Sequence, residues 1–285
     1  MYPVKYFKQV LLGKIFRPRT YVLLVLLGFV TYLYVKPVVA FSQEVHYKAA
    51  PWAFPFIVSN IYFIFLFMLG IVYYFSDVPF MQYYNMYQVI RTGRRNWAIV
   101  QIAAIMGQSF FIMGFGFLAS VLCLGGHCEL TLGWGKLLHT SALTNAAEHY
   151  GFLFSVPYEA MQRFEPLELA ALTICIGSLV ICFVGLLMFA ASLVFNRNVA
   201  VFLAAAMATA VYFVENIHPL IAQKVSMFVP VSWMRTTNIA TKVHGSYVVP
   251  PVEYMLTALA VGILVLCMII LWKVKRVEFQ WNKED

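Results

Sequence analysis

The sequence contains little charge. Only 11% of its residues are Asp, Glu, Lys or Arg, against about 25% in an average soluble domain, and 62% are hydrophobic. It also has no room for a soluble domain between its apolar stretches. The longest gap, Gly125–Pro166, is about 40 residues, near the lower limit for independent folding. We therefore expect any ATPase, kinase or binding domain that works with this chain to be a separate polypeptide.

Enzyme motifs are absent as well. There is no Gly-rich phosphate-binding loop ending in Gly-Lys-Ser/Thr, and no His-Glu-x-x-His pair for zinc. Gly177-Ser178 lies within an apolar stretch without a matching His or Asp, which is typical of helix packing. We expect no catalytic residue, no cofactor in this chain and no enzymatic activity of its own.

Cysteine and histidine are few and widely spaced. The set Cys123, His127, Cys128 and His139 fits no standard zinc spacing, so no metal site is expected. Cys123 and Cys128 leave two possibilities open: a disulfide, if that side of the chain is oxidising, or a membrane thiol oxidoreductase. The second would need another cysteine pair to relay electrons, and no such pair accompanies them.

What the sequence does contain is six long apolar stretches. A bilayer core of about 30 Å requires about 20 apolar residues per helix, and only closed backbone hydrogen bonding survives in lipid. The expected fold class is an all-α integral membrane protein with six transmembrane helices. The stretches are Tyr21–Ala40, Phe54–Phe75, Trp97–Leu124, Leu167–Phe195, Val199–Val214 and Tyr254–Trp272.

The distribution of basic residues predicts the orientation. With six spans and the N-terminus inside, most of the 20 Lys and Arg fall in cytoplasmic segments. Both termini are therefore expected in the cytoplasm. The net charge of +8 indicates attraction to anionic lipid rather than to nucleic acid, which is not an expected partner.

Three parts follow along the chain. The basic region, residues 1–19, runs nearly 20 residues before the first span, and that span exceeds the ~7–15-residue apolar region of a secretory signal, so no such signal is expected. Val4, Phe7, Leu11 and Ile15 recur at helical spacing. They predict an interfacial amphipathic helix, with a disordered basic tail as the alternative. The other parts are a six-span transmembrane domain at 20–275, with outer loops 125–166 and 215–250, and a cytoplasmic tail at 276–285.

The segment between the second and third spans predicts a short cytoplasmic helix over 77–95. Ser76 or Asp77 would cap it, Pro79 suits its first turn and Gly93 its end. Its aromatic, Met and Arg side chains suit a protein contact. The alternative is an interfacial helix whose aromatic side chains lie at headgroup depth.

This order of elements resembles the permease subunits of bacterial type-2 ABC exporters. The string Ser76-Asp77-Val78-Pro79, continued at Ile90-Arg91-Thr92-Gly93-Arg94-Arg95, is similar to the first cytoplasmic loop of small members, and Phe228–Trp233 to a Pro-aromatic element before their last span. The resemblance implies two ATP-binding cassette ATPase subunits, which hold ATP and Mg, and a second permease chain. It also implies candidate residues for ATPase-subunit docking: Phe80, Tyr83, Tyr84, Tyr87 and Arg91.

The cargo and two further alternatives rest on the polar residues within the spans. These are mostly Ser, Thr and Gln, which suits an amphipathic, peptide or lipid-like cargo better than a small ion. A proton-coupled secondary carrier is disfavoured because intramembrane carboxylates and an internal repeat are missing. A non-transporting scaffold or sensor is the other alternative.

Overall fold

The computed structural model describes residues 2–80, 86–241 and 247–276, with side chains over 6–80, 89–241 and 247–276. In this part of the chain every regular element is a helix, and the only extended pairing is an isolated bridge between Ala49 and Cys128. Five helices are long and apolar enough to cross a membrane, so the chain is an all-α, multi-pass membrane protein. They are α2 (Pro18–Val45), α6 (Arg94–Leu124), α10 (Pro166–Val194), α11 (Arg197–Asn216) and α13 (Val252–Lys273).

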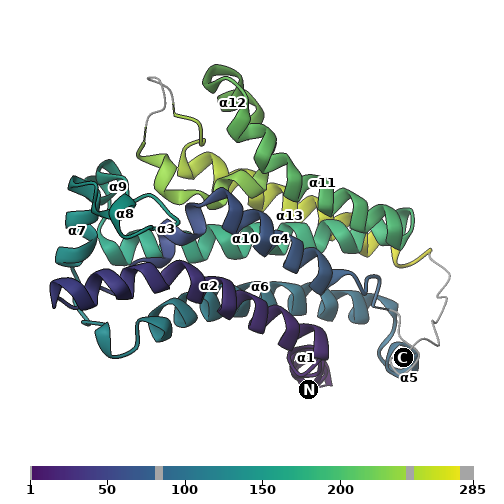
Figure 1. Ribbon diagram of the computed structural model, residues 1–285. Coiled ribbons are helices and arrows are strands. Elements are labelled where there is room, and N and C mark those ends of the chain that lie inside the picture. Colours follow the sequence, from purple (N-terminus) through teal and green to yellow (C-terminus); the bar gives the residue numbers. More distant parts are fainter. Residues whose placement is uncertain (1, 81–85, 242–246, 277–285) are drawn as a thin grey trace.

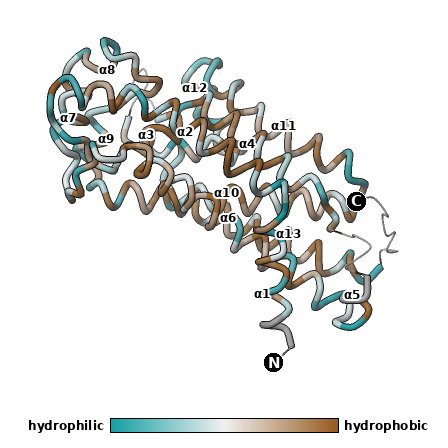
Figure 2. The backbone as a smooth tube through the Cα atoms, turned by 60° about the horizontal axis from the view of Figure 1, so that its bottom comes forward, coloured by the Kyte–Doolittle hydropathy of each residue, from teal (hydrophilic) through white to brown (hydrophobic). Residues whose placement is uncertain are grey.

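The long helices form an elongated bundle with two different ends (Figure 1). One end, the α5 end, carries α1 (Tyr2–Ile15) and α5 (Met86–Thr92). The other, the α7 end, carries α7 (Gly135–Leu143), α8 (Ala146–His149) and α9 (Tyr158–Arg163). Apolar residues dominate the long helices, whereas hydrophilic residues collect near both ends (Figure 2). This distribution is the one that a bilayer around the middle of the bundle requires.

Helix α10 lies at the centre of the bundle. It contacts α6, α11, α13 and α4. In its most apolar stretch of 18 residues, 72% of the residues are buried inside the protein. Its small residues let neighbours approach closely: a Cβ added at Gly185 would lie 2.9 Å from Ile105 and 3.0 Å from Phe75. Gly177 lies against the Met113 thioether, with Ser178 buried beside it. The expectation that Gly177-Ser178 serves helix packing is therefore confirmed.

The second apolar stretch is not one continuous helix. It forms α3 (Phe54–Ser59) and α4 (Ile61–Phe75), separated at Asn60. Asn60 is extended, with φ −74° and ψ 131°, and its side-chain oxygen accepts hydrogen bonds from the backbone N–H groups of Tyr62 and Phe63. It is thus the N-cap of α4, and a cap requires the helix to begin again there. With 15 residues, α4 is shorter than the five long helices.

The cytoplasmic helix expected over 77–95 is also different. Asp77, Val78 and Pro79 form turns, and the first described helical residue after them is Met86. The predicted cap is wrong because Ser76 and Asp77 bind arginine side chains instead of starting a helix. The end is as expected: α5 stops at Thr92, and Gly93, at φ 82°, lies between α5 and α6.

Two further segments complete the α7 end. After α11 come α12 (Pro219–Ser226) and two short 3₁₀ helices, η3 (Pro230–Met234) and η4 (Thr236–Ile239). After α6 comes a third, η2 (Gly125–His127). The segment of η3 and η4 is buried against α10. The Pro-aromatic element therefore supplies core residues, with Trp233 at 2% exposure, although Phe228 is 83% exposed.

Candidate functional site

The residues expected to dock an ATPase subunit do not share one exposed face. Phe80 is 2% exposed, and its ring packs 5.4 Å from that of Phe189 in α10. Tyr83 and Tyr84 lie outside the described residues, and Tyr87 lies on α5 without a described side chain. Arg91 is exposed in the last turn of α5. The expectation of Phe80 as an exposed contact is corrected: its position before α5 turns the ring into the bundle.

The exposed apolar residue of α5 is one that sequence reasoning missed. Ile90 is 70% exposed, whereas the preceding Val89 is 4% exposed. Two adjacent residues of a helix point about 100° apart, so one can face the protein while the next faces outward. In α5, Val89 takes the inner position and Ile90 the outer one. Ile90 and Arg91 together make α5 a mixed apolar and basic surface.

The turn before α5 is held by three arginines. The Arg17 guanidinium donates to the Asp77 carboxylate at 2.5 Å, and Arg19 donates to the Ser76 hydroxyl at 3.2 Å. Arg197, at the start of α11, donates to the Ser76 carbonyl at 2.7 Å. The Ser76–Asp77 turn is therefore fixed both to the beginning of α2 and to the beginning of α11.

Lys14 lies beside this turn and is almost fully buried. It is 5% exposed, and its Nζ lies 3.5 Å from the centroid of the Phe80 ring. No hydrogen-bond partner for Nζ is present among the described residues. Burial, opposed in part by the charge of Asp77, lowers the pKa of Lys14 to about 7. A lysine that is buried without a hydrogen-bond partner is unusual in a protein.

A small cavity connects Lys14 to α6. Its volume is about 10 Å³, close to that of one water-sized sphere. Its walls are aromatic side chains and five polar ones: Lys14, Arg17, Arg19, Asp77 and Gln108. Gln108 is 1% exposed, and neither of its amide atoms has a hydrogen-bond partner in the described part of the chain.

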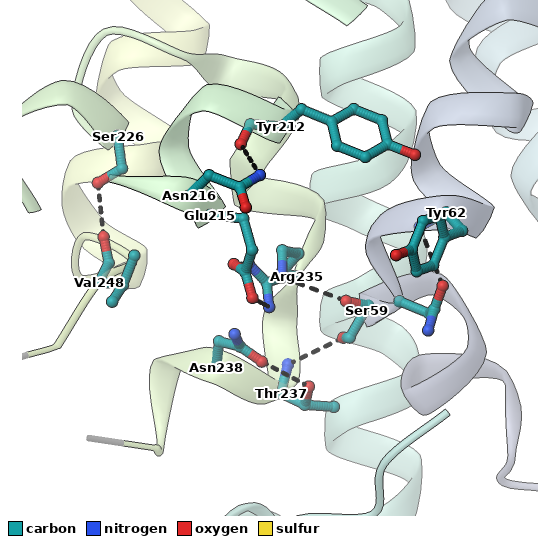
Figure 3. Close-up of polar contacts among 11 residues, drawn as sticks. Ser59, Tyr62, Tyr212, Glu215, Asn216, Ser226, Arg235, Thr237, Asn238 and Val248 are labelled. Carbon is teal, nitrogen blue, oxygen red and sulfur yellow. Dashed lines mark hydrogen bonds and ion pairs between the residues drawn. The ribbon is translucent and has the colours of Figure 1, made fainter. Parts of the chain in front are cut away.

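A second polar cluster lies at the α7 end (Figure 3). Arg235, with a side chain only 12% exposed, forms an ion pair with Glu215 at the end of α11. Its Nε also donates to the Ser59 carbonyl at 3.2 Å, and the Thr237 N–H donates to the Ser59 hydroxyl at 3.3 Å. Ser59 is the last residue of α3. The cluster thus joins α3, α11 and the buried segment of η3 and η4.

Asn60, next to that cluster, also reaches the α7–α8 region. Its amide donates to the Leu153 carbonyl at 2.7 Å, and its oxygen accepts from the Tyr34 hydroxyl at 2.9 Å. A cavity of about 470 Å³ opens beside it. Ser141, Thr144, Asn145 and Glu148 give the cavity polar walls, and Phe152 and Phe154 supply aromatic ones. No sequence motif pointed to Asn60, because its partners lie on distant segments.

Cys123 and Cys128 are both free thiols in this structure. The loop that holds them is fixed by the backbone: Ala49 N–H donates to the His127 carbonyl at 2.7 Å, and Glu129 N–H to the Ala49 carbonyl at 2.9 Å. Burial raises the pKa of the Cys128 thiol above its ordinary value, although Lys48 opposes this. A reactive redox thiol typically has a lowered pKa, whereas the pKa of Cys128 is raised, so this feature does not support the thiol oxidoreductase.

No family model matches this chain, and neither a curated protein nor a solved structure is similar to it. Its function is therefore argued from its own residues and architecture.

Proposed function

We propose that this chain is the permease subunit of a type-2 ABC exporter in a bacterial plasma membrane. It would cross the membrane six times with both termini in the cytoplasm, and it would work with a second permease chain and two separate ATPase subunits. The observation that carries this proposal is α5, a short helix with exposed Ile90 and Arg91 that stands between α4 and α6 at the same end as α1.

The sixth crossing would be made by α3 and α4 together. At a rise of about 1.5 Å per residue, the 15 residues of α4 cover about 22 Å, and the six residues of α3 extend this to about 31 Å. This matches a hydrocarbon core of about 30 Å. The break at Asn60 is tolerable at membrane depth because α3 is buried in protein throughout.

The contacts of the Ser76–Asp77 turn supply a route from α5 into the bundle. An ATPase subunit that moved α5 would pull on this turn, whose partners begin α2 and α11. Arg17 holds the Asp77 carboxylate and Arg197 holds the Ser76 carbonyl, and hydrogen bonds from a guanidinium are strong, so both helices would move with the turn. ATP-driven closure of the ATPase subunits would in this way change access to a pathway between two permease chains.

The cargo that we propose is amphipathic, peptide-like or lipid-like. In the described part of the chain no Asp or Glu is among the buried residues, whereas Gln101 and Ser178 are buried with unpaired side-chain atoms. Neutral polar groups of this kind suit a cargo with both polar and apolar parts better than a small ion.

The experiment is co-purification of the chain with its ATPase partner in mild detergent, followed by ATP hydrolysis. Ile90→Ser should reduce recovery of the ATPase about tenfold, as expected for loss of an apolar anchor. Leu132→Ser is the matched control, because Leu132 is also exposed (80%) but lies in the loop before α7, at the other end. Equal ATPase recovery with both variants, or no stoichiometric ATPase with the unaltered chain, would reject the proposal.

A further inference from the structure

The cavity at Lys14 has a chemistry that the docking role of α5 does not use. Three basic side chains line it, Lys14, Arg17 and Arg19, against the single carboxylate of Asp77. Asp77 is already bound by Arg17 at 2.5 Å. The cluster therefore carries an excess of positive charge with its one carboxylate engaged.

Lys14 is the residue that most needs a further partner. An ammonium taken out of water loses its hydration, and that loss is recovered only by an opposite charge or by hydrogen bonds. The Phe80 ring at 3.5 Å gives a cation–π contact, which is weaker than an ion pair. In the described part of the chain, Lys14 Nζ has no hydrogen-bond acceptor. An anion beside Nζ would supply both the charge and the acceptor.

Gln108 adds an independent reason to expect a ligand here. It comes from α6 and lines the same cavity, and both its amide atoms are buried without a partner among the described residues. An unpaired buried amide is costly, and the large majority of buried polar groups in proteins have a hydrogen-bond partner. The cavity of about 10 Å³ admits one oxygen atom, which could accept from both Lys14 Nζ and Gln108 Nε2.

The position of the cavity favours a ligand from the membrane surface. Helix α1 lies against α6, where Leu11 would contact a Cβ at Gly107 at 3.2 Å. Next to this contact the chain turns at Arg17 into the long apolar helix α2. The end of an apolar spanning helix is the depth at which lipid headgroups lie, and basic pockets between helices are suited to anionic headgroups.

We propose that Lys14, Arg17, Arg19 and Gln108 bind the phosphate group of an anionic phospholipid, with one phosphate oxygen in the cavity and the headgroup at the arginines. Phosphate binding does not require the proposed export activity, and the test below measures binding alone. A bound phosphate would hold α1 to the Ser76–Asp77 turn, so lipid composition would determine how firmly that turn is fixed. A soluble phosphate ester offers the same oxygen atoms and is distinguished below.

The test compares lipid retention by the full chain after delipidation. The chain is placed in vesicles of phosphatidylcholine with 10–30 mol% phosphatidylglycerol (roughly the anionic content that gives a charged leaflet) and re-extracted. Retained lipid is counted by native mass spectrometry. Lys14→Met should reduce retained phosphatidylglycerol about tenfold, because a charge-assisted hydrogen bond is lost. Lys8→Met is the matched control: Lys8 lies on the same helix and is exposed.

Two further measurements keep the test decisive. Gln108→Leu leaves every charge in place and should still reduce retention several-fold, so a failure of Lys14→Met to fold would not leave the proposal untested. Inorganic phosphate and glycerol phosphate are added to delipidated protein at millimolar concentration. A rise in melting temperature with these, but not with phosphatidylglycerol, would overturn the lipid assignment in favour of a soluble ester. Equal retention by Lys14→Met and Lys8→Met would overturn the site itself.

Discussion

Arg17 and Asp77 are 60 positions apart in the chain, yet the Arg17 guanidinium donates to the Asp77 carboxylate at 2.5 Å. Their side chains are 21% and 10% exposed, so the pair is largely shielded from solvent. It joins the start of α2 to the turn that precedes α5. Several consequences of this and neighbouring contacts can be measured.

The first prediction concerns the Arg17–Asp77 pair itself. Arg17→Met and Asp77→Asn should each destabilise the protein, and the double variant should be less destabilised than their sum by about 1–2 kcal/mol, because each single change leaves a shielded charge without its partner. The measurement is unfolding by SDS titration in mixed micelles. Strict additivity would show that the contact contributes nothing to stability.

The second prediction is a pH dependence due to Lys14. Its pKa is about 7 in the folded chain and 10.5 ordinarily, because burial disfavours the charged form; Asp77 raises the pKa and Arg17 lowers it. Between these values the unfolded chain holds a proton that the folded chain lacks. The free energy of unfolding should therefore rise with pH above about 7, by at most about 1.4 kcal/mol per unit, with the full penalty present below 7.

The measurement uses delipidated protein. It compares the free energy of unfolding of the unaltered chain with that of Lys14→Met at each pH. Subtraction removes the contributions of all other groups that titrate in this range. A difference that stays constant from pH 6 to 10 would contradict the lowered pKa of buried Lys14.

The third prediction concerns Asn60. Asn60→Ala removes the cap of α4, the bond to Tyr34 and the bond to Leu153, and should lower the free energy of unfolding by about 2–3 kcal/mol. Tyr34→Phe removes only one of these bonds and should cost about 1 kcal/mol. If the two variants are equally stable, the break between α3 and α4 does not depend on the Asn60 side chain.

The fourth prediction is the topology. In a background without native cysteines, Arg95→Cys and Leu130→Cys place single thiols at exposed positions near the α5 end and the α7 end. A membrane-impermeant maleimide added to intact cells should label only Leu130→Cys. Arg95 is a better site than Gly93, whose φ of 82° any larger side chain would strain. Labelling of Arg95→Cys from outside would reverse the proposed orientation.

Much of the fold could be predicted from the sequence because burial in lipid leaves a simple signature. Long apolar stretches predicted the five long helices to within a few residues at each end; Trp97–Leu124, for example, lies within α6 at Arg94–Leu124. Gly93 was recognised as the end of α5, since few other residues adopt its backbone conformation. These features depend on local hydropathy or on one residue's own geometry.

Other features required the tertiary structure, because they arise from contacts between distant segments. The sequence predicted Asp77 as a helix cap, but in the structure it binds Arg17. The sequence predicted Phe80 as an exposed contact, but Phe189 and Lys14 pack against its ring. Asn60 breaks the second apolar stretch with partners at Tyr34 and Leu153. Hydropathy along the chain determined that it lies in a membrane as helices. Only packing decided which polar groups were paired. It placed Lys14 and Gln108, both buried, in the wall of a cavity of about 10 Å³, large enough for one oxygen atom.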